Sequence, residues 1–325
     1  MAPFRFRAKF ILRGFMETAL RPMSTGELLD RTFTLYKRHF VLFIGISVPG
    51  PAIIVLITLV SAMMDALPAM KSHTGETVVA VIGFIAIGIA VLALLLGFAL
   101  AHAATIRAVS ALHLSKPTSI RRAYIELRGH YMRIVGIFVS VLIRVVGGSM
   151  LLYFASVMVG FMIGGTATLM GRIGLYVAIV VGIATFVGGI GLALTLVVRY
   201  AYAIQACVIE DIPGRQALKR SAFLAKGSRS RVLTVYVLFS VLSSAMWGCL
   251  ALLVSTCEAF IHSSQVISTL MSFAFFLTMV LTLPLATVAM SLAYYDERVR
   301  KEGFDLQVLI AGIEAPLAAK ATASN

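Results

Sequence analysis

The densest group of side chains that could do chemistry lies near the C-terminal end of the chain, in the segment YYDERVRKEGFDL. Carboxylates interleaved with cations could act as general acids and bases, bind an ion or recognise a partner. The same pattern is also typical of a charged helix end with no further role. The candidate residues of this closing motif are Tyr295, Asp296, Arg298, Arg300, Glu302 and Asp305. An enzyme would need Asp296, Glu302 and Asp305 to converge on one pocket.

Two further sets of cations are candidates for binding anionic groups. The first set lies in two basic connectors and consists of Arg121, Arg122, Lys219 and Arg220. The second set is Arg144 and Arg199, each isolated in a long apolar run. An arginine in such a run extends its side chain to the lipid headgroups at the membrane boundary, which is our interpretation of both. The alternative for Arg144 is an anion ligand near the middle of the membrane.

None of the common catalytic or cofactor-binding motifs is present in the sequence. HExxH, GxSxG, a Walker loop and a dinucleotide fingerprint are all missing. The histidines do not cluster at metal-ligand spacing, and the three cysteines form no CxxC pair. We therefore predict no metal, no cofactor and no catalytic residue, and a protein that is not an enzyme.

The composition indicates a membrane protein. The chain of 325 residues is 60% hydrophobic and 13% charged, with a formal net charge of +14, whereas soluble domains average about 45–50% apolar and 25% charged residues. A membrane span needs about 20 apolar residues. Six runs reach that length: 40–64, with a break expected at Pro49-Gly50-Pro51, and 77–105, 131–165, 173–207, 232–254 and 266–293.

The distribution of lysine and arginine predicts the orientation of these spans. Eight such residues precede residue 39, six lie at 107–133, six at 215–231 and four in the tail, whereas the opposite side offers only Lys71 and Arg172. Because cytoplasmic loops carry the positive excess, both termini should face the cytoplasm. We expect a cytoplasmic (inner) membrane, and we attribute the basic charge to anionic lipid, not to nucleic acid.

A basic amphipathic segment recurs before each pair of runs. It lies at 24–40, at 117–135 and at 213–233, and Ser24 with Glu27 forms a capping box at the start of the first copy. We call these segments elbow helices, because each should lie along the inner leaflet and turn up into a span. The sequence thus predicts an all-α integral membrane protein of six transmembrane helices in three repeated units, at about 24–115, 116–211 and 212–306.

The two ends of the chain fall outside this membrane domain of residues 24–310. Residues 1–23 form a basic segment that is either disordered or surface-lying, and a true start at Met16 or Met23 is an alternative. Residues 311–325 are an Ala-rich tail that we expect to be flexible.

Three motifs resemble the glycerophosphoryl diester phosphodiesterase membrane-domain family. They are LDRTFTLYKRHF at 29–40, VIEDIPGRQALKRSAFLAKGSRSRVL at 208–233 and, most specific, AYYDERVRKEGFDLQVL at 293–309. The resemblance covers nearly the whole chain and implies a multi-pass bacterial membrane domain. In some members that domain is fused to a hydrolytic barrel. Such a barrel needs about 250 residues, far more than follow residue 294, so the resemblance implies no hydrolase activity here.

Two functional hypotheses follow. The first is a non-enzymatic membrane domain that engages anionic lipid, or a partner protein, through its basic cytoplasmic face. The second is a transporter or channel for an anionic or amphipathic solute, with Arg144 and the break at Pro49 near its site. The lack of an Asp or Glu at mid-depth in any run argues against the second.

Overall fold

The computed structural model describes residues 23–66, 73–114, 116–258, 260–261 and 263–303, and every element assigned within these ranges is a helix. In chain order they are α2 (Thr25–Arg38), α3 (Phe40–Ser47), α4 (Pro49–Ala66), α5 (His73–His113), α6 (Ile120–Ile125), α7 (Tyr131–Leu142), the π-helical turn η2 (Ile143–Gly147), α8 (Gly148–Tyr200), α9 (Ala203–Ile209), α10 (Gly214–Ala225), α11 (Arg229–Glu258) and α12 (Ser264–Glu302).

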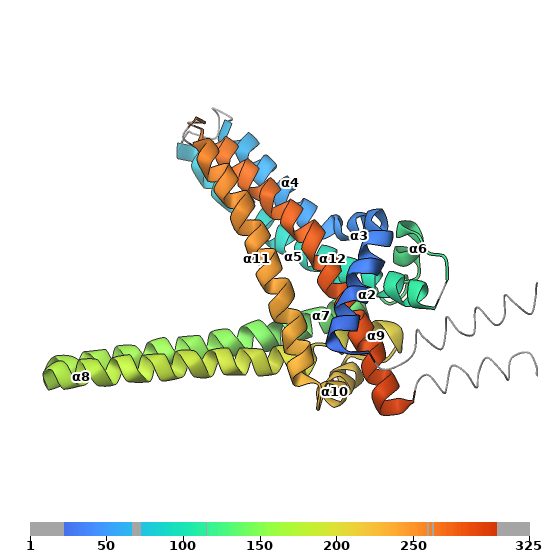
Figure 1. Cartoon of the computed structure of the whole chain (residues 1–325). Coiled ribbons are helices and arrows are strands. Elements are labelled where there is room, and N and C mark those ends of the chain that lie inside the picture. Colours follow the sequence, from blue (N-terminus) through green and yellow to red (C-terminus); the bar gives the residue numbers. More distant parts are fainter. Residues whose placement is uncertain (1–22, 67–72, 115, 259, 262, 304–325) are drawn as a thin grey trace, which may run out of the picture.

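The helices form two arms that diverge from a common base (Figure 1). Helices α4, α5, α11 and α12 pack side by side and make a four-helix arm. The other arm consists of η2 and α8, and we call it the hairpin arm. The base contains α2, α3, α6, α9 and α10, together with the ends of the long helices.

The hairpin arm is one helical element by backbone assignment but has two antiparallel legs. A Cβ built on Gly148 would lie 3.1 Å from Leu196, and one built on Gly189 would lie 3.5 Å from Leu152. As the first leg advances from Gly148 to Leu152, the contacted residue on the second leg moves back from Leu196 to Gly189. The chain therefore reverses direction between the two legs. Small residues let the two legs approach closely where there is no hydrophobic drive between helices.

Within the described ranges, five helices are long and apolar enough to cross a membrane. They are Gly83–His113, Tyr131–Met162, Ile179–Ile209, Arg229–Glu258 and Ser264–Glu302. A sixth crossing would require Phe40–Ser47 and Pro49–Met63 to act as one span, and these two are bent by 49°. The bend confirms the predicted break at Pro49, since proline cannot donate a backbone hydrogen bond within a helix.

The elbow segments are helical, but they pack differently from the sequence expectation. The amphipathic pattern of the first segment predicts that Leu29, Phe33, Tyr36 and Phe40 form one apolar face toward the leaflet. Instead, α2 buries Leu28, Thr32 and Tyr36 in the base, while Phe33 and Phe40 are exposed. The hydroxyl of Tyr36 donates to the carbonyl of Leu281 on α12, at 2.9 Å. The elbow is therefore part of the folded core of the base and does not simply lie on a leaflet.

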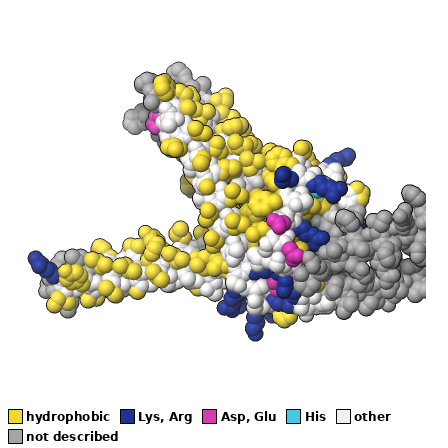
Figure 2. Space-filling view, in the orientation of Figure 1, with side chains coloured by type: hydrophobic (Ala, Val, Ile, Leu, Met, Phe, Trp, Pro, Cys, Tyr) yellow, Lys and Arg dark blue, Asp and Glu magenta, His cyan; other side chains and the backbone are white. Residues whose placement is uncertain are grey.

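Charge and apolar surface separate along the molecule. Figure 2 shows apolar side chains covering both arms, whereas lysine and arginine gather on the base. In the hairpin arm, none of the most apolar window of Ile179–Ile209 is buried by the rest of the protein. An element that is apolar all round and unburied needs a nonpolar solvent, so the two arms fit a membrane protein.

Candidate functional site

The closing motif lies at the end of α12, and its first part is buried even though it carries two adjacent carboxylates. Tyr295, Asp296 and Glu297 are each exposed by 2% or less. Buried carboxylates are unstable unless they are paired and hydrogen-bonded. The partners of this motif therefore determine what it can do.

Asp296 connects the starts of two other helices to α12. It accepts a hydrogen bond from the backbone nitrogen of Met23 at 2.5 Å and from Nε of Arg300 at 2.7 Å. It also pairs with Arg231 in the first turn of α11. Glu297, the next residue, lies 3.6 Å from the same guanidinium and 3.2 Å from Nζ of Lys301.

A second group of charges ties α12 to α10. Arg220 of α10 donates from Nε and Nη2 to Glu210 at 2.9 and 3.0 Å, and from Nη2 to Glu302 at 2.6 Å. Arg298 lies 3.3 Å from Glu210 and 3.4 Å from Glu302. Burial alone would raise the pKa of Glu210, but the hydrogen bonds from Arg220 and Tyr294 outweigh it and hold this pKa below its usual value.

We call these interleaved ion pairs the charged clamp. It consists of Glu210, Arg220, Arg231, Asp296, Arg298, Arg300 and Glu302. Tyr295 extends the contacts to α5, because its hydroxyl lies 2.7 Å from that of Ser110 and its ring stacks on His113 at 4.7 Å. The clamp joins segments that lie far apart in the sequence, and its paired carboxylates are arranged for structure.

The remaining residue of the closing motif, Asp305, lies outside the described residues. Asp296 and Glu302, the other two carboxylates that an enzyme site would need, both point at arginines within the clamp. Among the described residues, no group of three or more histidine, cysteine or acidic side chains could hold a metal ion.

The six cations predicted to bind headgroups do not form one site. Arg220 belongs to the clamp. Arg121 and Arg122 lie exposed on α6, where Arg122 pairs with Glu126 at 2.9 Å, and Lys219 is exposed on α10. Arg144 lies in η2 and donates to the carbonyl of Ser140, one turn nearer the base, at 2.8 Å. Its guanidinium thus turns back toward the base.

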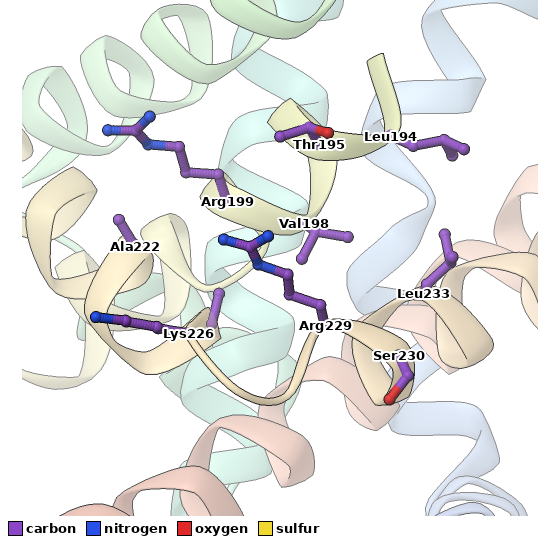
Figure 3. A pocket seen from close by; sticks show the side chains of 10 residues that line it. Leu194, Thr195, Val198, Arg199, Ala222, Lys226, Arg229, Ser230 and Leu233 are labelled. Atoms are coloured by element: carbon purple, nitrogen blue, oxygen red, sulfur yellow. The ribbon is translucent and has the colours of Figure 1, made fainter. Parts of the chain in front are cut away.

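Arg199 lines a pocket of about 440 Å³ where the hairpin arm meets α10 and α11, which we call the junction pocket. It is lined by Leu194, Thr195, Val198, Arg199, Ala222, Ala225, Lys226, Arg229, Ser230 and Leu233. Figure 3 shows the charged ends of Arg199, Lys226 and Arg229 directed to one side, with Leu194 and Leu233 on the other.

Two of these three cations, Lys226 and Arg229, were not among the residues singled out from the sequence. A signal for them exists in the segment KGSR, which links α10 to α11. Gly227 adopts a φ of +94°, and a left-handed glycine after a helix marks a tight reversal that brings flanking side chains together.

Comparison of the chain with protein-family models, with curated proteins and with solved structures finds no match.

Proposed function

We propose that this protein is a non-enzymatic multi-pass membrane domain that engages anionic lipid, or a partner protein, through its base. The observation that carries the proposal is how charge is divided there. Asp296 and Glu302 of the closing motif are turned inward and paired, whereas Arg121, Lys219, Lys226 and Arg229 are exposed. These four cations have no carboxylate partner among the described residues, and a surface of such cations next to two apolar arms suits anionic headgroups, at about 1 kcal/mol for each cation near the surface.

The proposed topology has six spans in three units, with both termini in the cytoplasm of a bacterium and α3 with α4 as one bent span. Supporting it, the first and second elbow segments align at an offset of 91 residues. This alignment places His39 opposite His130, and the two residues have similar φ angles of −121° and −115°. Gly129 and Gly227, aligned in the second and third copies, both have positive φ, at +84° and +94°.

An ion pair recurs in the second and third units as well. Arg133, at the start of α7, pairs with Asp211 just beyond α9. Arg231, at the start of α11, pairs with Asp296 near the end of α12. In both units an arginine that opens the first span is bound by an acid that follows or ends the second, which supports descent from one repeated unit.

We also propose membership of the glycerophosphoryl diester phosphodiesterase membrane-domain family, as a membrane domain only. The three motifs that resemble it coincide with α2, with the segment from α9 to the start of α11, and with the end of α12. All of these elements build the base, and they supply the residues of the charged clamp. The resemblance thus falls where the fold is most constrained by pairing.

The lipids that remain bound during purification test the lipid proposal. The protein is extracted in a mild detergent, and its lipids are compared with those of the host membrane. We expect the anionic fraction to be at least twofold higher in the purified sample. An anionic fraction equal to that of the host membrane would contradict lipid engagement and leave a partner protein as the remaining target.

Passage of an anionic or amphipathic solute is a second candidate, because regular helix is interrupted at several points of the described residues and two of these interruptions lie near the proposed site. These are the 49° bend at Pro49 and the π-helical turn that carries Arg144. Such breaks line substrate paths in transporters. Flux of a fluorescent anion into proteoliposomes, compared with Arg144→Gln, tests it: flux that the substitution abolishes would support transport, and no flux above protein-free vesicles would exclude it for that anion.

A further inference from the structure

The junction pocket concentrates positive charge. Arg199, Lys226 and Arg229 contribute to its lining from three helices or their connections, and no Asp or Glu is among the described residues that line it. All three side chains are exposed, and the guanidinium of Arg199 lies 5.8 Å from the ring centre of Tyr200. Three cations around one pocket repel one another, so an anion bound between them would be favourable.

The charged and apolar residues of the pocket lie at different distances from the base. In α8 the chain runs toward the base, so Leu194 lies about 7.5 Å farther out than Arg199 at 1.5 Å per residue. In α11 the chain runs away from the base, so Leu233 lies about 6 Å farther out than Arg229. The cations thus lie at the base end and the apolar side chains lie toward the membrane interior.

This order matches an amphiphile whose charge is at one end. Guanidinium groups bind phosphate oxygens with paired hydrogen bonds, so a phosphate is the anion that two arginines and a lysine suit best. The volume of about 440 Å³ also falls within the range of ligand pockets, about 300–1,000 Å³. A free phosphate ion would use only the cations, whereas Leu194, Val198 and Leu233 require an apolar chain.

We propose that the junction pocket binds one anionic phospholipid. Its phosphate lies among Arg199, Lys226 and Arg229, and its acyl chains run outward between the hairpin arm and α11. The inference rests on the proposed engagement of anionic lipid and names the site and the ligand class.

Native mass spectrometry of the full chain in detergent, titrated with dioleoyl phosphatidylglycerol, tests the site. We expect one phospholipid to bind at the lowest lipid concentrations, and Arg199→Gln/Lys226→Gln/Arg229→Gln to weaken this first binding at least tenfold. A matched triple variant, Lys37→Gln/Arg38→Gln/Arg215→Gln, removes the same charge from exposed positions of the base that are not among the cations assigned to lipid. It should change the first binding less than threefold.

Equal weakening in the two triple variants would overturn the site while leaving diffuse lipid engagement by the base intact. The two outcomes can be told apart, because a loss of anionic enrichment in the wild type would overturn both the site and the general lipid engagement.

Competition identifies the source of the phosphate. Inorganic phosphate at millimolar concentration should not displace the lipid, and dioleoyl phosphatidylcholine should bind at least tenfold more weakly. Displacement by phosphate would assign the pocket to a soluble anion.

A second pair of variants leaves the three cations in place. Ala222, half-buried on α10, also lines the pocket. Ala222→Glu places a carboxylate near the cations, whereas Ala222→Gln adds a side chain of nearly the same shape without charge. We expect the glutamate variant to bind phosphatidylglycerol at least fivefold more weakly than the glutamine variant. Equal binding by the two would contradict a phosphate at this position.

Discussion

The charged clamp and the junction pocket are built from neighbouring residues but use charge in opposite ways. Arg229 and Arg231 are two positions apart in the first turn of α11, and at about 100° per residue they lie on nearly opposite faces of the helix. Arg231 is 11% exposed and pairs with Asp296 in the clamp, whereas Arg229 lines the pocket and has no carboxylate partner within the part of the chain that the structure describes. Whether a cation serves structure or a ligand is therefore decided here by helix face.

Lys226 shows both uses within one residue, because its backbone contributes to structure and its side chain to the pocket. Its backbone carbonyl accepts a hydrogen bond from Nζ of Lys301 at 2.7 Å, which fixes the end of α10 against α12. Its side chain lines the junction pocket. Removing the side chain charge should therefore leave the clamp intact. The physical reason for the division is solvation, because a desolvated charge needs a partner and a hydrated one does not.

The largest effect should come from the centre of the clamp. Asp296→Asn keeps the shape of the side chain but leaves Arg231 and Arg300 without their shared carboxylate. Glu297 still lies 3.6 Å from Arg231, so that charge keeps one weaker partner, and we expect a loss of about 3 kcal/mol in the free energy of unfolding, the low end of the cost of breaking a buried pair. Thermal unfolding in detergent, followed by circular dichroism, measures it.

Glu126→Gln is the matched control, since it removes one carboxylate from the exposed pair with Arg122. Its expected cost is about 0.3–0.5 kcal/mol. Similar melting temperatures for the two variants would show that the clamp is no more important to the fold than a surface ion pair.

A smaller effect should distinguish two adjacent cations of α10. Arg220→Gln removes the hydrogen bonds to Glu210 and Glu302 and should cost about 1.5 kcal/mol, near the low end for bonds to charged groups because the arginine is one-quarter exposed. Lys219→Gln, one residue earlier and exposed, should change stability by less than about 0.5 kcal/mol. A lysine variant as damaging as the arginine variant would contradict the division between them.

The third effect depends on pH. The pKa of Glu210 is lower in the folded protein than its ordinary value of 4.5, so its contribution is complete above that pH and is lost as the pH falls through the folded pKa. Glu210→Gln should therefore be less stable than wild type at pH 7, and the difference between the two melting temperatures should shrink below about pH 4.5. A difference that stays constant down to pH 3 would show that the charge of Glu210 is unimportant.

The smallest effect on stability should come from the junction pocket. Arg199→Gln in lipid-free detergent should melt within about 0.5 kcal/mol of wild type, because this exposed side chain has no carboxylate partner among the described residues. Added phosphatidylglycerol should raise the melting temperature of wild type more than that of the variant. A large loss of stability without lipid would show that Arg199 stabilises the fold and would contradict a role limited to lipid binding.

Local sequence patterns predicted the helices but not which charged residues pair between them. The break at Pro49 and the helices of the three elbow segments follow from residues close together in the chain. The clamp could not be predicted in this way, because Asp296 lies 65 positions from Arg231 and 273 from Met23. The same sequence is compatible with an exposed helix end and with a buried network. The junction pocket escaped detection for a similar reason, since Arg199 reaches Lys226 and Arg229 only after the hairpin arm returns to the base.

The order in which the clamp residues leave the ribosome has a consequence for how the protein is made. Glu210, Arg220 and Arg231 are synthesised before Asp296 and Glu302, which arrive only with the end of α12. Until then Arg231 has no buried carboxylate, so the base cannot close around it. We expect a nascent chain arrested at residue 285 to be cleaved by protease in the connector between α9 and α11, and the full chain released from the ribosome to resist. Translation of the last helix is thus the step that turns a set of inserted helices into a folded protein.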